Sequence, residues 1–108
     1  MIYRGITGTY RQHRSLSWWS TDPAHAARYC HGEDGAELLS LDETGLSIVD
    51  CPEEIGDSWL SDVESQQWAM GLLRAMGIDG FRRQDGAGEA VCLLPEALRR
   101  RVRVYEQF

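Results

Sequence analysis

The stretch LSWWSTDPAHAARYC, residues 16–30, decides the fold because it leads a short strand directly into a helix. The aromatic and apolar side chains at 16–19 favour a strand, and successive side chains of a strand point to opposite faces. At most one of Trp18 and Trp19 can therefore enter a core on one face. The other lies on a second surface, where an indole ring can stack on a flat ligand.

The helix that follows has a clear start. Asp22 is typical of an N-cap residue, and Pro23 suits the first helical position because its missing N–H needs no partner there. These residues predict a helix that runs through Tyr29 and ends at Gly32. A helix start explains the preceding Ser–Thr pair without any ligand, although its free N–H groups can also hold an anion.

A second, longer helix is predicted over residues 59–76. Ser61 and Glu64 have the spacing of a capping box, and Gly77 suits the helix end. Apolar residues recur near the helical period through this segment, so the stripe that they form is predicted to face the core. Its members are Leu60, Val63, Trp68, Leu72, Leu73 and Met76.

Short strands separated by turns account for the rest of the chain. The first is predicted to break at Gly5, and a polar turn at 42–45 separates the third from the fourth. Short strands with two main helices in this order predict one α+β domain over residues 1–108, built on antiparallel sheet. Besides 16–19, the strands are predicted at 2–4, 37–41, 46–49, 80–83, 89–94 and 102–105, with a half-helix at 95–98.

The composition is typical of a folded single domain. The chain has 108 residues, 43% of them hydrophobic, enough for one core but not for two. It has no apolar run of 18 residues and no signal-peptide pattern, so we expect a cytoplasmic protein without membrane contact. Three cysteines without CxxC spacing predict buried thiols rather than disulfides. No metal site is expected, because the spacing of Cys30, His31, Cys51 and Cys92 matches no standard pattern.

Charge is unevenly distributed along the chain. Residues 32–66 contain eleven acidic residues and no basic one. The chain has no lysine, so all 11 of its Lys and Arg residues are arginines. An acidic segment disfavours nucleic-acid binding through its own face and attracts a basic surface. Residues 32–66 are therefore a candidate contact for a basic partner.

Motifs for the common chemistries are absent from the sequence: it has no Walker A loop, GxGxxG, HExxH or GxSxG. His13, His25 and His31 do not cluster and are interpreted as surface side chains or caps.

Three polar positions at predicted strand ends remain, namely Arg4, Ser20 with Thr21, and Glu89. An arginine fork can hold a pyrophosphate and a hydroxyl can bond a ribose. A carboxylate can stabilise the cation formed when an N-glycosidic bond breaks, so together these groups meet the needs of NAD cleavage.

Four blocks of the sequence, in this order, resemble the ADP-ribosyltransferase superfamily. They are YRG at 3–5, WSTD with AHAARY at 19–29, MGIDGFRR at 76–83 and GEAVCLLP at 88–95. The late block is especially similar to small bacterial and phage-borne members. The resemblance implies a split antiparallel β core with NAD, as substrate, in the cleft between its halves.

The resemblance also implies roles for individual residues. Arg4, Ser20 and Glu89 would form the catalytic set, with Arg4 on the NAD phosphates, Ser20 and Thr21 on the nicotinamide ribose and Glu89 as the catalytic acid. Gly5 belongs to the first block and would border the nucleotide. The rings that would stack on nicotinamide are those of Tyr3, Trp18, Trp19 and Tyr29.

Two departures from the family pattern leave the chemistry open. Arginine-modifying members carry Glu or Gln two residues before the catalytic glutamate, and this chain has Ala87 there. An arginine acceptor is therefore in doubt. Asp85 is the alternative to Glu89 as the working carboxylate if the last hairpin strand begins earlier than predicted.

The function expected from the resemblance is mono-ADP-ribosylation of a macromolecular acceptor, with a protein as the favoured acceptor. A phage anti-defence activity, such as an anti-CRISPR, or a toxin would be compatible with the size of the chain. Two alternatives stay open: a NAD glycohydrolase, and an inactive transferase-like scaffold whose acidic residues 32–66 block a basic partner.

Overall fold

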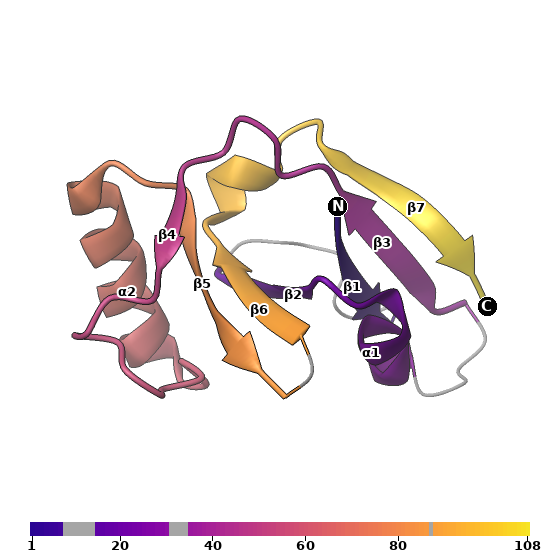
Figure 1. The fold of residues 1–108 in the computed structure, drawn as a ribbon, viewed down its shortest axis with the longest axis horizontal. Coiled ribbons are helices and arrows are strands. Elements are labelled where there is room, and N and C mark those ends of the chain that lie inside the picture. Colours follow the sequence, from indigo (N-terminus) through magenta and orange to yellow (C-terminus); the bar gives the residue numbers. More distant parts are fainter. Residues whose placement is uncertain (8–14, 31–34, 87) are drawn as a thin grey trace.

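The computed structural model describes residues 1–7, 15–30, 35–86 and 88–108. In these ranges the chain forms a seven-stranded sheet with two α-helices and two short 3₁₀ helices (Figure 1). The strands are β1 (Ile2–Ile6), β2 (Ser17–Ser20), β3 (Glu37–Leu41), β4 (Ile48–Asp50), β5 (Gly80–Asp85), β6 (Gly88–Leu93) and β7 (Val102–Gln107). The helices are α1 (Pro23–Ala27), η2 (Arg28–Cys30), α2 (Val63–Met76) and η3 (Pro95–Leu98).

The sheet has the strand order β4-β5-β6-β2-β1-β3-β7. All neighbouring strands are antiparallel except β4 and β5, which run parallel. The predicted α+β class is confirmed. The sheet, predicted to be antiparallel, is mixed, because β4 and β5 are parallel. The chain passes through α2 between β4 and β5, and a helical connection of this kind brings the next strand back in the same direction.

The contact between β1 and β2 divides the sheet. These strands share a single paired position, Tyr3 with Ser20, whereas β1 pairs with β3 along its whole length and β2 does so with β6. One half therefore contains β4, β5, β6 and β2, and the other contains β1, β3 and β7 (Figure 1). The opening between β1 and β2 is where the candidate site lies.

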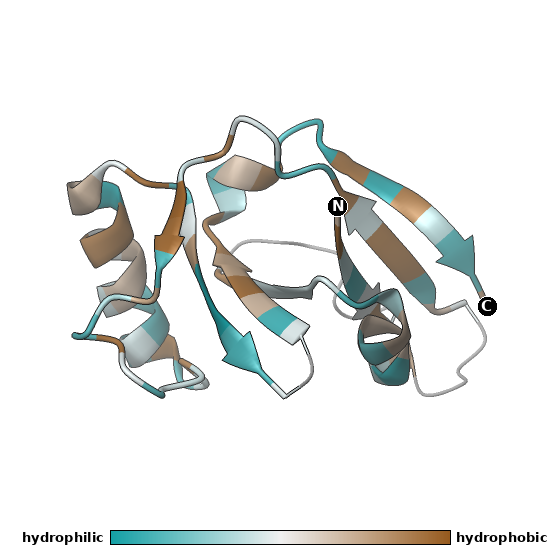
Figure 2. Cartoon of the chain, in the orientation of Figure 1, coloured by the Kyte–Doolittle hydropathy of each residue, from teal (hydrophilic) through white to brown (hydrophobic). Residues whose placement is uncertain are grey.

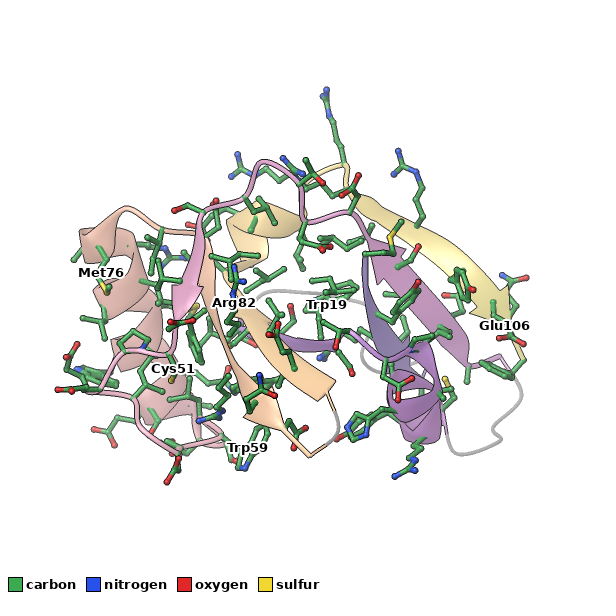
Figure 3. All side chains as sticks on the ribbon, in the orientation of Figure 1. Trp19, Cys51, Trp59, Met76, Arg82 and Glu106 are labelled. Carbon is green, nitrogen blue, oxygen red and sulfur yellow. The ribbon has the colours of Figure 1, made fainter. Side chains whose placement is uncertain are left out.

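The two faces of the sheet bury separate apolar clusters. Trp19 packs with Ile2, Leu41 and Leu93 in one cluster, at the middle of the molecule (Figure 3). Phe81 and Cys92 pack in the other, beneath Ala69 and Leu73 of α2. Trp19 is 2% exposed while Trp18 borders the second cluster and stays half-buried. The prediction that only one of the two tryptophans enters a given core is confirmed.

The predicted start of α1 is confirmed. The Asp22 carboxylate accepts a hydrogen bond from the Ala24 N–H at 3.0 Å, and Pro23 is the first helical residue. The predicted end at Gly32 lies outside the described residues, and the α-helix itself ends at Ala27. The prediction that Gly5 breaks β1 was wrong, because β1 continues through Gly5, which pairs with Leu38 of β3. A residue without a side chain is needed there because α1 packs on β1, and an added Cβ would collide with the Ala26 carbonyl oxygen.

The longer helix, α2, differs from its prediction in three ways. It begins at Val63 rather than at residue 59. Its N-cap is Asp62 rather than Ser61, since the Asp62 carboxylate accepts from the Ser65 N–H at 2.9 Å. Gly77, with φ of 70°, ends the helix as predicted. The predicted core stripe is only partly buried, because one narrow side of the helix contacts the sheet, through Ala69 and Leu73. The exposed fractions of Val63, Trp68 and Met76 are 72%, 49% and 46%, and Met76 points outward from the molecule (Figure 3).

The remaining strands are close to their predicted ranges but pair differently from their order in the sequence. The strands on either side of the turn at 42–45, β3 and β4, do not pair with each other, and β4 lies at the far edge of the sheet. The half-helix at 95–98 is confirmed as a 3₁₀ helix. Figure 2 shows that much of β3 and β6 is hydrophobic, while the C-terminal half of β5 is hydrophilic. Among the described residues, no helix has the length and apolar character needed to cross a membrane.

Candidate functional site

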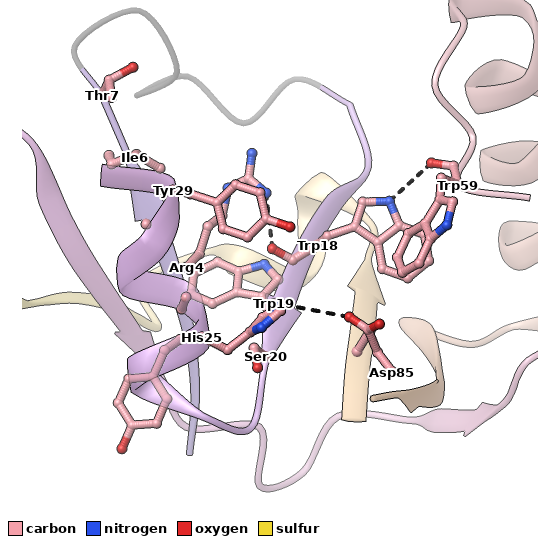
Figure 4. A pocket seen from close by; sticks show the side chains of 14 residues that line it. Arg4, Ile6, Thr7, Trp18, Trp19, Ser20, His25, Tyr29, Trp59 and Asp85 are labelled. Carbon is pink, nitrogen blue, oxygen red and sulfur yellow. Dashed lines mark hydrogen bonds and ion pairs between the residues drawn. The ribbon is translucent and has the colours of Figure 1, made fainter. Parts of the chain in front are cut away.

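A cavity of about 740 Å³ opens where β1 and β2 separate (Figure 4). Its volume is within the range of about 300–1,000 Å³ that is usual for small-molecule sites. Strands β1 and β2, helix α1, the end of β5 and the segment before α2 supply its walls. It brings together most of the residues that the sequence singled out: Tyr3, Arg4, Gly5, Trp18, Trp19, Ser20, Tyr29 and Asp85.

Arg4 lies in this opening, and its side chain forms a hydrogen bond from β1 to the backbone of β2, where the two strands have little pairing. Its Nη1 donates to the Trp18 carbonyl oxygen at 2.9 Å (Figure 4). The Nε atom is buried and has no hydrogen-bond partner, and no carboxylate forms an ion pair with Arg4, among the residues that the structure describes. Burial lowers the pKa of Arg4, yet an arginine stays charged in a protein. A half-buried cation without an anion is costly, so the site is suited to a negatively charged ligand.

Trp59, which the sequence did not single out, forms an aromatic wall of the cavity with Trp18. The Trp18 Nε1 donates to the Trp59 carbonyl oxygen at 3.2 Å, and the two rings lie 4.9 Å apart. The Arg83 guanidinium is 4.6 Å from the Trp18 ring and 4.4 Å from the Trp59 ring. It also donates to the carbonyl oxygens of Gly56 and Ser58. Arg83 therefore holds the segment before α2 against β2.

We expect Arg83→Met to lower the free energy of unfolding by about 2–4 kcal/mol, because it removes two charge-assisted hydrogen bonds and both cation–π contacts. Arg82→Met is the matched control. Its side chain is exposed and donates a hydrogen bond to the Ile48 carbonyl oxygen at 3.1 Å, so we expect a change of at most about 1 kcal/mol. Urea unfolding followed by tryptophan fluorescence measures both. Equal stability of the two variants would show that Arg83 does not hold this wall.

His25 and Asp85 lie next to each other in the lining of the cavity. The His25 Nε2 lies 3.7 Å from the Asp85 Oδ2, and each side chain is 36% exposed (Figure 4). The interpretation of His25 as a surface side chain or cap missed this position. One signal was available in the sequence: His25 and Tyr29 are four residues apart and share a helix face, and their ring centroids are 6.0 Å apart.

Glu89 and Thr21 do not line the cavity. The Thr21 hydroxyl accepts from the Glu89 N–H at 3.1 Å, and the Thr21 N–H donates to the Glu89 carbonyl at 3.2 Å. In the β5–β6 hairpin, Glu89 pairs with Gln84 and Ala90 with Arg83. Side chains alternate along a strand and paired residues share a face. Asp85 is therefore on the face of Ala90, which lines the cavity, and Glu89 is on the other.

The acidic residues of 32–66 are distributed over different elements. Asp62 caps α2, Glu37 is buried in β3, and Glu43 pairs with the N-terminal amino group at 2.8 Å. Residues 32–34 lie outside the described part of the chain. Glu53, Glu54 and Asp57, in the segment that precedes Trp59, are exposed.

The cysteines are free thiols, with Cys30 and Cys92 buried and Cys51 half-buried. Burial raises the pKa of all three, and that of Cys92 to about 12. Such thiols are poor nucleophiles. His31 lies outside the described residues, and within the described ranges no three His, Cys, Asp or Glu side chains form a group that could hold a metal ion.

Comparison with known proteins gives no relative. No family model, curated protein or solved structure matches the chain. A function for the cavity therefore has to be argued from the groups that line it.

Proposed function

We propose that the cavity binds NAD and that the protein is a mono-ADP-ribosyltransferase, which transfers ADP-ribose from NAD to a macromolecular acceptor. The observation that carries the proposal is the half-buried Arg4 guanidinium, which has no described carboxylate partner, in an aromatic cavity of about 740 Å³. The planar fork of arginine matches the oxygens of a phosphate. A pyrophosphate would satisfy this cation.

The other groups of the cavity suit the rest of the nucleotide. Trp18, Trp59 and Tyr29 offer aromatic surface for a flat ring. The Ser20 oxygen accepts from the Asp22 N–H at 3.1 Å, which leaves the hydroxyl proton free to bond a ribose or carboxamide oxygen. A ligand with two phosphates, a ribose and a flat ring therefore fits the distribution of charge and aromatic surface.

Asp85 is the carboxylate that the cavity favours for the reaction. It would accept a hydrogen bond from the 2′-hydroxyl of the nicotinamide ribose and stabilise positive charge at C1′. The bond from C1′ to the nicotinamide nitrogen breaks, and its electron pair leaves with neutral nicotinamide. The acceptor nucleophile then bonds C1′ and gives up its proton. Asp85 takes here the role that the family resemblance gives to Glu89.

NAD binding is tested by the melting temperature of the protein with and without NAD. Ligand at a hundred times its dissociation constant stabilises the native state by about 2.7 kcal/mol, so we expect the wild type to melt several degrees higher with NAD. Arg4→Ala is expected to lose this shift. Arg99→Ala, which removes an exposed arginine that does not line the cavity, is expected to keep it. Each variant is compared with itself without NAD, so a stability change of its own does not matter.

Catalysis is tested by nicotinamide release and by transfer of labelled ADP-ribose to proteins of a cell lysate. Release with labelled protein supports the transferase. Release without any labelled macromolecule would identify a NAD glycohydrolase instead. A wild type that shows neither a melting shift with NAD nor nicotinamide release would overturn the proposal.

A further inference from the structure

His25 and Asp85 reach the cavity from opposite halves of the split sheet. His25 is on α1, which packs over β1, and Asp85 ends β5. They are 60 positions apart in the chain, yet Nε2 and Oδ2 are 3.7 Å apart. Within the described part of the chain, His25 is the basic side chain that pairs with Asp85.

The two partners differ in how firmly they are held. The helix that carries His25 is capped by Asp22 and seated on Gly5, where an added Cβ would collide with the Ala26 carbonyl oxygen. Asp85 is the last residue of β5 and is followed by the turn residue Gly86, which has a φ of 60°. Its partner across the hairpin is Gly88, the first residue of β6. The backbone that carries His25 is thus fixed by a cap and by close packing on β1, which suits this residue to direct the carboxylate.

We propose that His25 is a positioning residue that donates from Nε2 to Asp85 and directs this carboxylate towards the ribose of the substrate; the role rests on the proposed function. A separation of 3.7 Å is longer than a hydrogen bond. Catalytic hydrogen bonds are often long without substrate and tighten in the complex. We expect this separation to shorten in the complex, when the Asp85 carboxylate turns to meet the ribose.

The test compares nicotinamide release by the wild type, His25→Phe and His25→Gln. Phenylalanine keeps the ring volume without a donor, and glutamine places an amide donor near the position of Nε2. A misdirected catalytic group can cost about a hundredfold in rate. We therefore expect His25→Phe to lower kcat about 10–100-fold with the KM for NAD within about threefold, and His25→Gln to recover most of the lost rate.

A double-variant cycle distinguishes positioning from a general structural effect. If His25 acts through Asp85, the variant with both His25→Phe and Asp85→Asn has about the kcat of Asp85→Asn alone, because the effects of groups that work as a unit do not add. A double variant that is at least tenfold slower would overturn the proposed role. So would a normal kcat in His25→Phe, or a loss confined to KM.

The failure of this role differs from the failure of the proposed function. A wild type that neither binds nor cleaves NAD overturns both. A wild type that does so, with a His25→Phe variant of equal kcat, overturns the role of His25 alone.

Discussion

Asp85→Asn is expected to slow nicotinamide release about 10²–10³-fold, whereas Glu89→Gln leaves the rate within about threefold of the wild type. Removing one group that stabilises developing charge has an effect of the first size. The two substitutions are matched, because each turns a carboxylate into its amide within the same hairpin. Only Asp85 lines the cavity, and the hairpin register turns Glu89 to the other face.

The measurement is kcat/KM for NAD, with the melting shift by NAD as a separate readout of binding. Because Arg4 would hold the phosphates, both variants are expected to keep the shift. The reverse order of rates, with Glu89→Gln slow and Asp85→Asn normal, would make Glu89 the working carboxylate. It would also contradict the part that we propose for His25.

Gly5→Ala is expected to lower the free energy of unfolding by about 1–3 kcal/mol. The new Cβ would overlap the Ala26 carbonyl oxygen and approach the Cys30 Sγ to 3.1 Å, and overpacking in a closely fitted place has a cost of this size. A backbone atom cannot turn aside as a flexible side chain can. Helix α1 must move instead, and His25 and Tyr29 with it, so the melting shift by NAD is expected to shrink as well.

Gly71→Ala is the matched control for this prediction, with the opposite sign. Gly71 lies inside α2 and has open space around the position of a Cβ. Alanine in a helix interior is favoured over glycine by about 0.5–1 kcal/mol, so this variant is expected to be more stable than the wild type. Thermal or urea unfolding measures both. A Gly5→Ala variant as stable as the wild type would show that α1 is not seated on β1.

Much of the candidate site could be predicted because local features carry it. The strand ends that hold Arg4 and Ser20 are marked by short apolar runs and a helix start next to them, and both residues line the cavity. Trp59 could not be predicted in this way. The sequence places it at the first position of a predicted helix, whereas in the structure it lies in the segment before Val63, where α2 begins. Contacts of both indole rings with Arg83 of β5 hold it next to Trp18.

The exposed stripe of α2 shows the same limit. The helical period predicts which residues of a helix share a face. It does not predict how much of that face the neighbouring sheet covers. Here the covered strip is narrow, so Ala69 and Leu73 are buried while Trp68 and Met76 are exposed.

The sequence by itself determined the features whose partners are a few residues away. These are the Asp22 cap of α1, the left-handed Gly77 at the end of α2 and the opposite faces of Trp18 and Trp19. Only the tertiary structure decided which carboxylate enters the cavity and which histidine meets it. The physical reason is register: a shift of one residue in a hairpin turns every side chain to the other face. The side chains of Asp85 and Glu89 take their places from the pairing of β5 with β6. His25 takes its place from the helix seated on β1, and Arg4 from the gap between β1 and β2.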